Sequence, residues 1–223
     1  MRARLAGVAG VLALVHGDRP EAWQLLNDAL AEWRQQDSPR DLAYVLLNLG
    51  FVAGDAGRLA EAQSYMEEGL VASRAAVDQV LEAFCLERLG QFALQRGDTA
   101  TAAEYLDESI RLATERGALR VIGYARHTHA WLCYGAHDYG AARAEFDASR
   151  AAFAALDERW GQTLGHAGYG HAAAAQGDVV VARARFLEIL GSASEPGNPL
   201  IPCFVVEGFA PGTGRGAARR GGW

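Results

Sequence analysis

The chain has 223 residues, and 50% of them are hydrophobic, which is enough for a continuous core and argues against bulk disorder. Its net charge of −6 opposes direct binding to nucleic acid, which depends on neutralisation of phosphates by basic residues. All 21 basic residues are Arg, so the chain has no Lys for a P-loop, a kinase-type site or a Schiff base.

The first feature along the chain is an apolar run, LAGVAGVLALV, at residues 5–15. After two arginines it has the look of a signal-peptide core. It is too short to span a membrane as a helix, which needs about 20 apolar residues. The same residues fall in phase with the repeat described next. We therefore interpret them as the first helix of a repeat array and expect no membrane association.

A 40-residue period runs through the chain, marked by a Gly-Asp pair. The marker positions are Gly17, Gly57, Gly97, His137 and Gly177. Ala stands five residues after every marker, and a large apolar residue stands nine after it: Leu26, Met66, Leu106, Phe146 and Phe186. A small residue, Gly or Ala, stands seven before each marker. A period in this range indicates a solenoid of stacked units.

Each unit predicts two helices joined by the Gly-Asp turn, because apolar residues recur at spacings of three and four on both sides, as in 41–54 and 59–71. Gly can end the first helix in a left-handed conformation, and Asp can cap the second. Arg58 replaces the Asp in the second unit, so we expect that cap to be lost. Ser38 and Pro39 predict the N-cap and first residue of the next helix.

The pattern of two small residues and one large residue resembles the tetratricopeptide repeat (TPR). Gly50, Ala62 and Met66 form one such trio, and the spacing is the same in all five units. The usual period is about 34 residues, and longer second helices, such as 99–115, would absorb the difference. The closing Pro of that family is absent. The resemblance implies an all-α fold, a right-handed α-solenoid built as a TPR-like superhelix.

The 40-residue form, with phrases such as ALVHGD and ESIRLATERG, resembles the C-terminal helical arrays of bacterial LuxR-type and SARP-type ATP-dependent transcription regulators. In those proteins the array follows a nucleotide-binding module and acts as a sensor or docking surface. The resemblance covers residues 3–210. This chain has no P-loop and no helix-turn-helix with a basic face. We therefore expect either a free-standing repeat protein or the end of a larger regulator.

The repeat phase predicts three segments: an array at 1–194, a partial sixth repeat with only a first helix at 195–210, and a flexible Gly/Arg-rich tail at 211–223. The five repeats of the array are expected at 1–37, 38–77, 78–117, 118–157 and 158–194.

The chain shows no residue spacing typical of catalysis or metal binding. His127 and His129 are two apart on a predicted helix, so their side chains point to different faces. We expect no enzymatic activity, no cofactor and no metal. The three cysteines, Cys85, Cys133 and Cys203, are far apart, which favours a reducing compartment and a cytoplasmic location.

The TPR resemblance implies that certain positions of the first helices line a concave groove. These positions hold Tyr44, Leu47, Phe51, Phe84, Glu87, Gln91, Tyr124, His127, Trp131, Tyr134 and His171. A row of aromatics with a few polar groups suits a peptide or a small ligand. The alternative is that these aromatics only fill space in a tightly wound superhelix.

Our main hypothesis is a non-catalytic scaffold that binds a protein or peptide in this groove. It would be the sensor or interaction region of a bacterial transcription regulator or signalling ATPase, without direct nucleic-acid binding. One alternative is a repeat domain that senses a small-molecule effector. Another is a truncated remnant of a larger regulator, which the Pro- and Gly-rich sequence after residue 210 favours.

Overall fold

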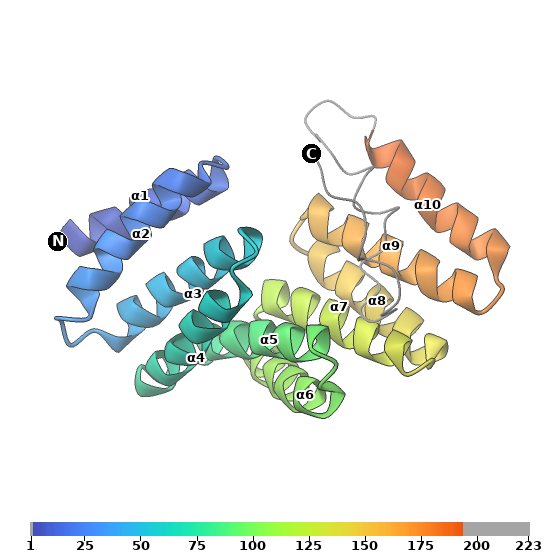
Figure 1. Cartoon of the computed structure of the whole chain (residues 1–223). Coiled ribbons are helices and arrows are strands. Elements are labelled where there is room, and N and C mark those ends of the chain that lie inside the picture. The colour runs from blue at the N-terminus through green and yellow to red at the C-terminus, as the bar shows by residue number, and fades with distance from the viewer. Residues whose placement is uncertain (1, 194–223) are drawn as a thin grey trace, which may run out of the picture. The chain divides into compact units, whose positions relative to one another are not determined.

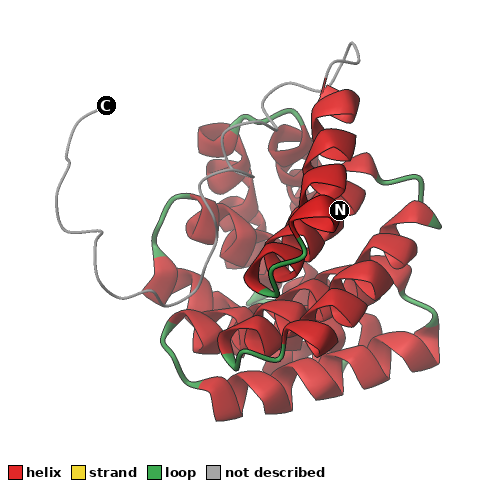
Figure 2. Cartoon of the chain, turned by 90° about the vertical axis from the view of Figure 1, so that its right-hand side faces the viewer, coloured by secondary structure: helices red, strands yellow, loops and turns green. Residues whose placement is uncertain are grey.

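The computed structural model describes residues 2–193, and throughout that range every regular element is a helix (Figures 1 and 2). The helices are α1 (Arg2–Val15), α2 (Arg19–Trp33), α3 (Pro39–Asp55), α4 (Leu59–Ala75), α5 (Gln79–Gln95), α6 (Thr99–Arg116), α7 (Leu119–Gly135), α8 (Tyr139–Ala154), α9 (Arg159–Ala175) and α10 (Val179–Ala193). The all-α prediction is confirmed. The partial sixth repeat and the tail lie outside the described residues.

The chain folds as two compact units, each with its own set of internal contacts. Among the described residues, the first comprises Arg2–Phe92 with Asp107–Val121, and the second comprises Ala93–Leu106 with Ile122–Ala193. In the first unit α1 packs on α2, α2 on α3 and α3 on α4; in the second α8 packs on α9 and α9 on α10. Packing of each helix on its neighbours in the sequence is the arrangement of a helical-repeat solenoid.

The Gly-Asp turns have the predicted geometry. All five marker residues have positive φ, from 62° at His137 to 81° at Gly17 and Gly177. Asp follows four of the five markers, and its carboxylate accepts a hydrogen bond from the backbone N–H three residues later, as from Glu21 to Asp18 at 3.0 Å. These caps satisfy N–H groups that the helix leaves unpaired.

Two further details of the helix caps were also predicted. Arg58 makes no side-chain cap, as expected; its guanidinium instead lies 3.6 Å over the ring of Trp23. Pro39 begins α3 and Ser38 occupies the N-cap position, as predicted, but the Ser38 side chain accepts no hydrogen bond from the helix. Its hydroxyl donates instead to Oδ2 of Asp41 at 2.6 Å, and this charge-assisted hydrogen bond is stronger than one accepted from a neutral backbone N–H.

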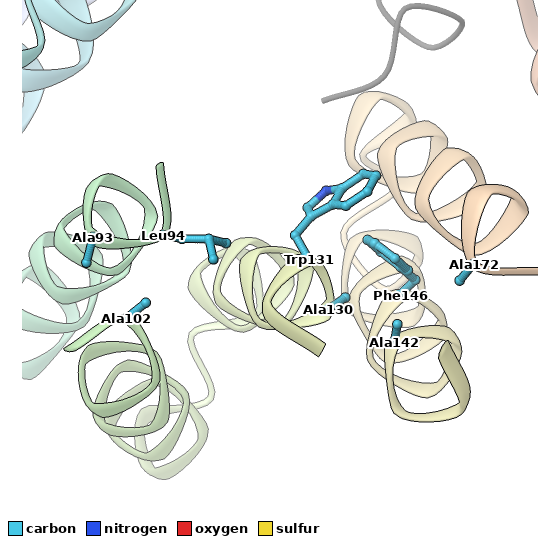
Figure 3. Packing of buried hydrophobic residues seen from close by; sticks show 8 residues of the cluster. All are labelled: Ala93, Leu94, Ala102, Ala130, Trp131, Ala142, Phe146 and Ala172. Atoms are coloured by element: carbon cyan, nitrogen blue, oxygen red, sulfur yellow. The ribbon is translucent and has the colours of Figure 1, made fainter. Parts of the chain in front are cut away.

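The small-residue columns allow close helix contacts, in which a large side chain fills the space that a Cβ would occupy. A Cβ on Gly10 would lie 2.8 Å from Cγ of Leu26, and one on Gly50 would overlap Met66. These contacts lie within one repeat. Phe146 also lies against Gly168 of the following repeat, so large side chains fill space between successive repeats as well. In the second unit the same column forms a core with Ala130, Ala142 and Phe146 (Figure 3).

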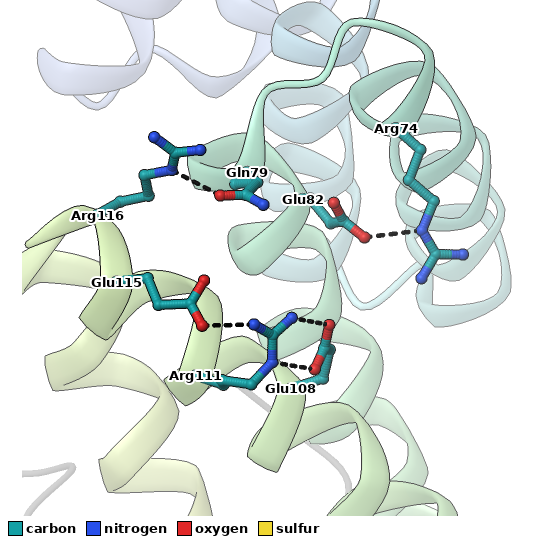
Figure 4. A network of polar contacts seen from close by, with 7 residues as sticks. All are labelled: Arg74, Gln79, Glu82, Glu108, Arg111, Glu115 and Arg116. Carbon is teal, nitrogen blue, oxygen red and sulfur yellow. Dashed lines mark hydrogen bonds and ion pairs between the residues drawn. The ribbon is translucent and has the colours of Figure 1, made fainter.

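The outer face of the first unit carries ion pairs. Arg111 contacts Glu108 and Glu115 at 2.6 Å, and Arg74 of α4 contacts Glu82 of α5 at 2.8 Å (Figure 4). Hydrogen bonds from Arg111 lower the pKa of Glu108. Exposed pairs such as those of Arg111 contribute little stability each, so they do little to hold the helices together.

A second set of left-handed turns, which the sequence did not indicate, joins one repeat to the next. Val77, Gly117 and Asp157 are 40 residues apart, with φ of 53°, 63° and 53°. Only Gly adopts this region without a penalty, and a β-branched residue is strained there.

We therefore expect Val77→Gly to raise the free energy of unfolding by about 1 kcal/mol, since relief of strain exceeds the entropy that Gly adds to the unfolded chain. The Val77 side chain is 80% exposed, so little packing is lost. Urea denaturation measures the change. The matched control, Gly117→Val in the same column, should lower stability; equal effects of the two variants would contradict the assignment.

A second prediction concerns the glycine contacts. Gly168→Ala should cost about 1–3 kcal/mol, because the added methyl group overlaps the Phe146 ring. Gly191→Ala is the control in α10, where a Cβ meets nothing within 4 Å, and it should stabilise by up to about 1 kcal/mol. Thermal melting of both variants tests this, and a stable Gly168→Ala variant would refute the close contact.

Candidate binding surfaces on the first helices

The eleven predicted residues lie on the first helices of the repeats, with α3 and α5 in the first unit and α7 and α9 in the second. On each helix they are spaced three, four or seven apart and therefore share one face. Each unit thus has its own candidate surface, which we call the first-unit surface and the second-unit surface.

The first-unit surface combines aromatic rings with an amide and an arginine. Tyr44 is 43% exposed, and Phe51, Phe84 and Gln91 are partly exposed. Arg88, which the sequence reasoning missed, joins them: its guanidinium lies 4.6 Å from the Phe51 ring centre, and its Nη1 donates to Oε1 of Gln91 at 2.8 Å. The sequence could have indicated Arg88, because it lies between the predicted residues Glu87 and Gln91 on the same helix.

Glu87 is part of this surface only indirectly. Its side chain is buried, and Oε2 lies 2.9 Å from Nε of Arg88. A buried carboxylate requires a paired charge, and here the pair fixes the arginine. Leu47 is also buried. Glu87 and Leu47 were predicted to line the groove, but both side chains are buried and do not contact a partner directly.

The second-unit surface is built on an aromatic cluster around Trp131. The indole is only 9% exposed and packs edge-on against Phe146 at 5.1 Å (Figure 3). It also packs edge-on against Tyr134 at 5.4 Å. Its Nε1 donates to Nε2 of His127 at 3.1 Å, and the His171 ring lies 6.1 Å away. Trp131 therefore offers little surface to a groove, and its indole instead packs against Phe146 of α8.

The groups that remain accessible in the second unit are polar edges of this cluster. Tyr124 packs edge-on against Phe153 at 4.9 Å, and its hydroxyl lies 3.4 Å from Oε1 of Glu158. His127, Tyr134 and His171 are partly exposed. Buried rings thus hold a set of imidazole and phenol groups at the surface, and these can accept or donate hydrogen bonds.

Burial shifts the pKa values of a cysteine and a histidine among the described residues. Burial raises the pKa of the Cys85 thiol to about 12, so no thiolate nucleophile forms at neutral pH. Burial lowers the pKa of His166 despite Glu188 at 2.9 Å, and its imidazole is neutral at pH 7. Within the described residues, no three His, Cys, Asp or Glu side chains are grouped to hold a metal ion.

Two hollows in the first unit lie away from the candidate surface. One, of about 350 Å³, is lined by Arg40, Val77, Asp78 and Arg116 among others, and one of about 370 Å³ lies beside Trp23. Neither contains any of the eleven predicted residues. Among the described helices, none is both long and apolar enough to cross a membrane.

Comparison with known proteins agrees with this architecture. Residues 41–115 match the family model described as tetratricopeptide repeat. The crystal structure of BtubC (BKLC) from P. vanneervenii is similar with a TM-score of 0.66 and 18% identity, over 87% of this chain and 82% of that one. Residues 41–115 thus carry the sequence pattern of this repeat, and the described residues have the fold of a TPR-like solenoid. No protein of curated function matches the sequence.

Two further solved structures share the TPR-like fold. A Rap protein complexed with Competence and Sporulation Factor has a TM-score of 0.75 and 13% identity, over 86% of this chain and 54% of that one. The TPR-like repeats of a putative kinesin light chain from Podospora anserina have a TM-score of 0.62 and 14% identity, over 86% and 94%. At these identities the comparison concerns the fold alone.

The burial of Trp131 predicts that its replacement costs far more stability than replacement of an exposed tryptophan. Trp131→Ala should cost about 3–5 kcal/mol, because a fully packed ring is lost. Trp160→Ala should change stability by about 0.5 kcal/mol or less, because that indole is 44% exposed. Chemical denaturation of the two variants measures the difference, and similar losses would contradict the cluster.

Proposed function

We propose that this TPR-like protein is a non-catalytic scaffold that binds a protein or peptide through the first-unit and second-unit surfaces. The observation that carries the proposal is the construction of these surfaces. In both units, partly exposed aromatic and hydrogen-bonding groups stand on a packed base, so they are held in place before a partner arrives. Pre-ordered groups lose little entropy on binding.

The chemistry of the surfaces suits an extended peptide. Tyr44, Phe51 and Phe84 offer flat apolar area, while Arg88 and Gln91 offer donors and an acceptor to a peptide main chain. Aromatic and arginine side chains are the residues that most often dominate binding energy at such interfaces. The two hollows lie elsewhere on the first unit, which favours a peptide over an enclosed small effector.

The comparisons add support at the level of fold. TPR-type repeats generally serve as protein-interaction scaffolds, and the Rap structure is named as a complex with Competence and Sporulation Factor. A place in a bacterial transcription regulator or signalling ATPase rests on the 40-residue form of the repeat, and a cytoplasmic location rests on the spacing of the cysteines. Both are parts of this proposal.

A display library of random peptides, selected on the immobilised full chain, tests the proposal. We expect enriched peptides that share aromatic or apolar anchors. Synthetic versions should lose about tenfold or more in affinity towards Tyr44→Ala or Gln91→Ala, measured by fluorescence polarisation.

Trp160→Ala is the matched control, because its side chain is as exposed as that of Tyr44 but lies outside both surfaces. It should bind the peptides as well as the wild type does. If Trp160→Ala loses as much affinity, or if scrambled peptides bind equally, the surface assignment is wrong. If no peptide is enriched and a small metabolite raises the melting temperature instead, the protein is an effector sensor.

A further inference from the structure

The hollow of about 350 Å³ in the first unit lies where the ends of three helices meet. Arg40 comes from the start of α3, Gln79 from the start of α5 and Arg116 from the end of α6. Asp78, the residue before α5, also lines it. Both arginines are exposed, so their guanidinium groups border a hollow that a ligand can reach from solvent.

Both guanidinium groups are fixed by neighbouring side chains. Nε of Arg40 donates to Oδ2 of Asp78 at 2.8 Å. Nε of Arg116 donates to Oε1 of Gln79 at 2.6 Å (Figure 4). The Nη atoms of Arg40 and Arg116 have no hydrogen-bond partner among the described residues. Each arginine therefore presents unused N–H donors whose position is already set.

The residues that line the hollow carry one positive charge in excess. Burial would raise the pKa of Asp78, but hydrogen bonds from Arg40 and from the first N–H groups of α5 lower it, so this carboxylate is ionised and balances Arg40. Arg116 is bonded to the neutral Gln79, and no carboxylate of the described residues pairs with it. An excess of one charge suits a carboxylate better than a phosphate, which carries up to two negative charges.

Two valines give the hollow an apolar wall. Val77 is 80% exposed, and Val80 is half-buried. Val77 has a positive φ of 53°, although Gly117 occupies the same position one repeat later. Strained backbone of this kind occurs preferentially at functional sites. Here it keeps an exposed aliphatic side chain at the edge of the hollow, where a glycine would be easier to accommodate.

The repeat itself does not require these charges. The residues 40 positions after Arg40, Asp78 and Arg116 are all uncharged: Val80, Ala118 and Leu156. The two arginines are therefore specific to one junction between repeats, and the general packing of helix on helix does not account for them.

We propose that this hollow is a second binding site, which takes an acidic segment of a partner protein. A carboxylate of that segment accepts hydrogen bonds from the Nη atoms of Arg40 and Arg116, and a neighbouring aliphatic side chain contacts Val77. The arginine fork matches the two oxygens of a carboxylate, and such charge-assisted bonds are stronger than those between neutral groups. The hollow contains no residue of the first-unit surface, so this site is separate from the one described above.

An NMR titration of the full chain tests the proposal. The probe is a synthetic hexapeptide of alternating Glu and Leu with both ends blocked, at about 0.15 M salt, where long-range attraction is screened. The backbone amide signals of residues 76–80 and the Nε–H signal of Arg116 should shift and saturate. The same peptide with Gln in place of Glu should cause no such shifts, because it lacks the carboxylates.

Arg116→Gln should weaken the Glu peptide by about tenfold or more, since charge-assisted hydrogen bonds are lost. Arg116 is exposed and bonds only to Gln79, so the fold should be retained. Arg111→Gln is the matched control on the same helix. It removes the same charge, but all three nitrogens of Arg111 already donate to Glu108 and Glu115, so binding should be unchanged.

Val77→Gly supplies a readout that a structural role alone would not move. It should raise stability by relief of strain, and it should nevertheless weaken the Glu peptide by about threefold, because an aliphatic contact is lost. An affinity equal to that of the wild type would overturn the apolar half of the proposal.

The remaining outcomes against the proposal are distinct. If Arg111→Gln weakens binding as much as Arg116→Gln, the attraction is one of overall charge and the hollow is not a site. If the Gln peptide binds equally, no carboxylate is recognised. A phosphoserine peptide that binds tenfold tighter would make the occupant a phosphorylated segment. Loss of binding in Tyr44→Ala would place the peptide on the first-unit surface instead, so the two proposals fail separately.

Discussion

The structure depends on the seating of a large side chain on a small residue of the facing helix. Leu26 against Gly10, Met66 against Gly50 and Phe186 against Gly170 each bring the two helices of one repeat close together. Close approach is possible only where a Cβ is missing or small, and the large side chain then fills the remaining volume at the density of a protein interior. Because this contact has the same register in the three repeats, it sets the spacing of the two helices in each of them.

This packing also explains how the candidate surfaces are divided between core and solvent. One face of each first helix is used within the repeat and another receives the preceding second helix. The remaining face holds Tyr44 and Gln91 in the first unit and Tyr134 in the second. The Trp131 ring belongs to the core, while the polar groups beside it remain partly exposed. The surfaces therefore have a rigid base, which suits recognition without catalysis.

The sequence by itself determined the repeat, the helix pairs, the left-handed turns at Gly17 and its counterparts, and the Asp caps. Each of these follows from local chemistry: apolar periodicity, the freedom of Gly at positive φ and the reach of a short carboxylate. Only the tertiary structure decided that Trp131, Glu87 and Leu47 are buried and that the partly buried Arg88 lies over the Phe51 ring. Exposure depends on which neighbouring helix covers a face. The covering helix is supplied by residues distant in sequence, so equivalent positions in the repeats can differ in exposure although their sequence pattern is the same.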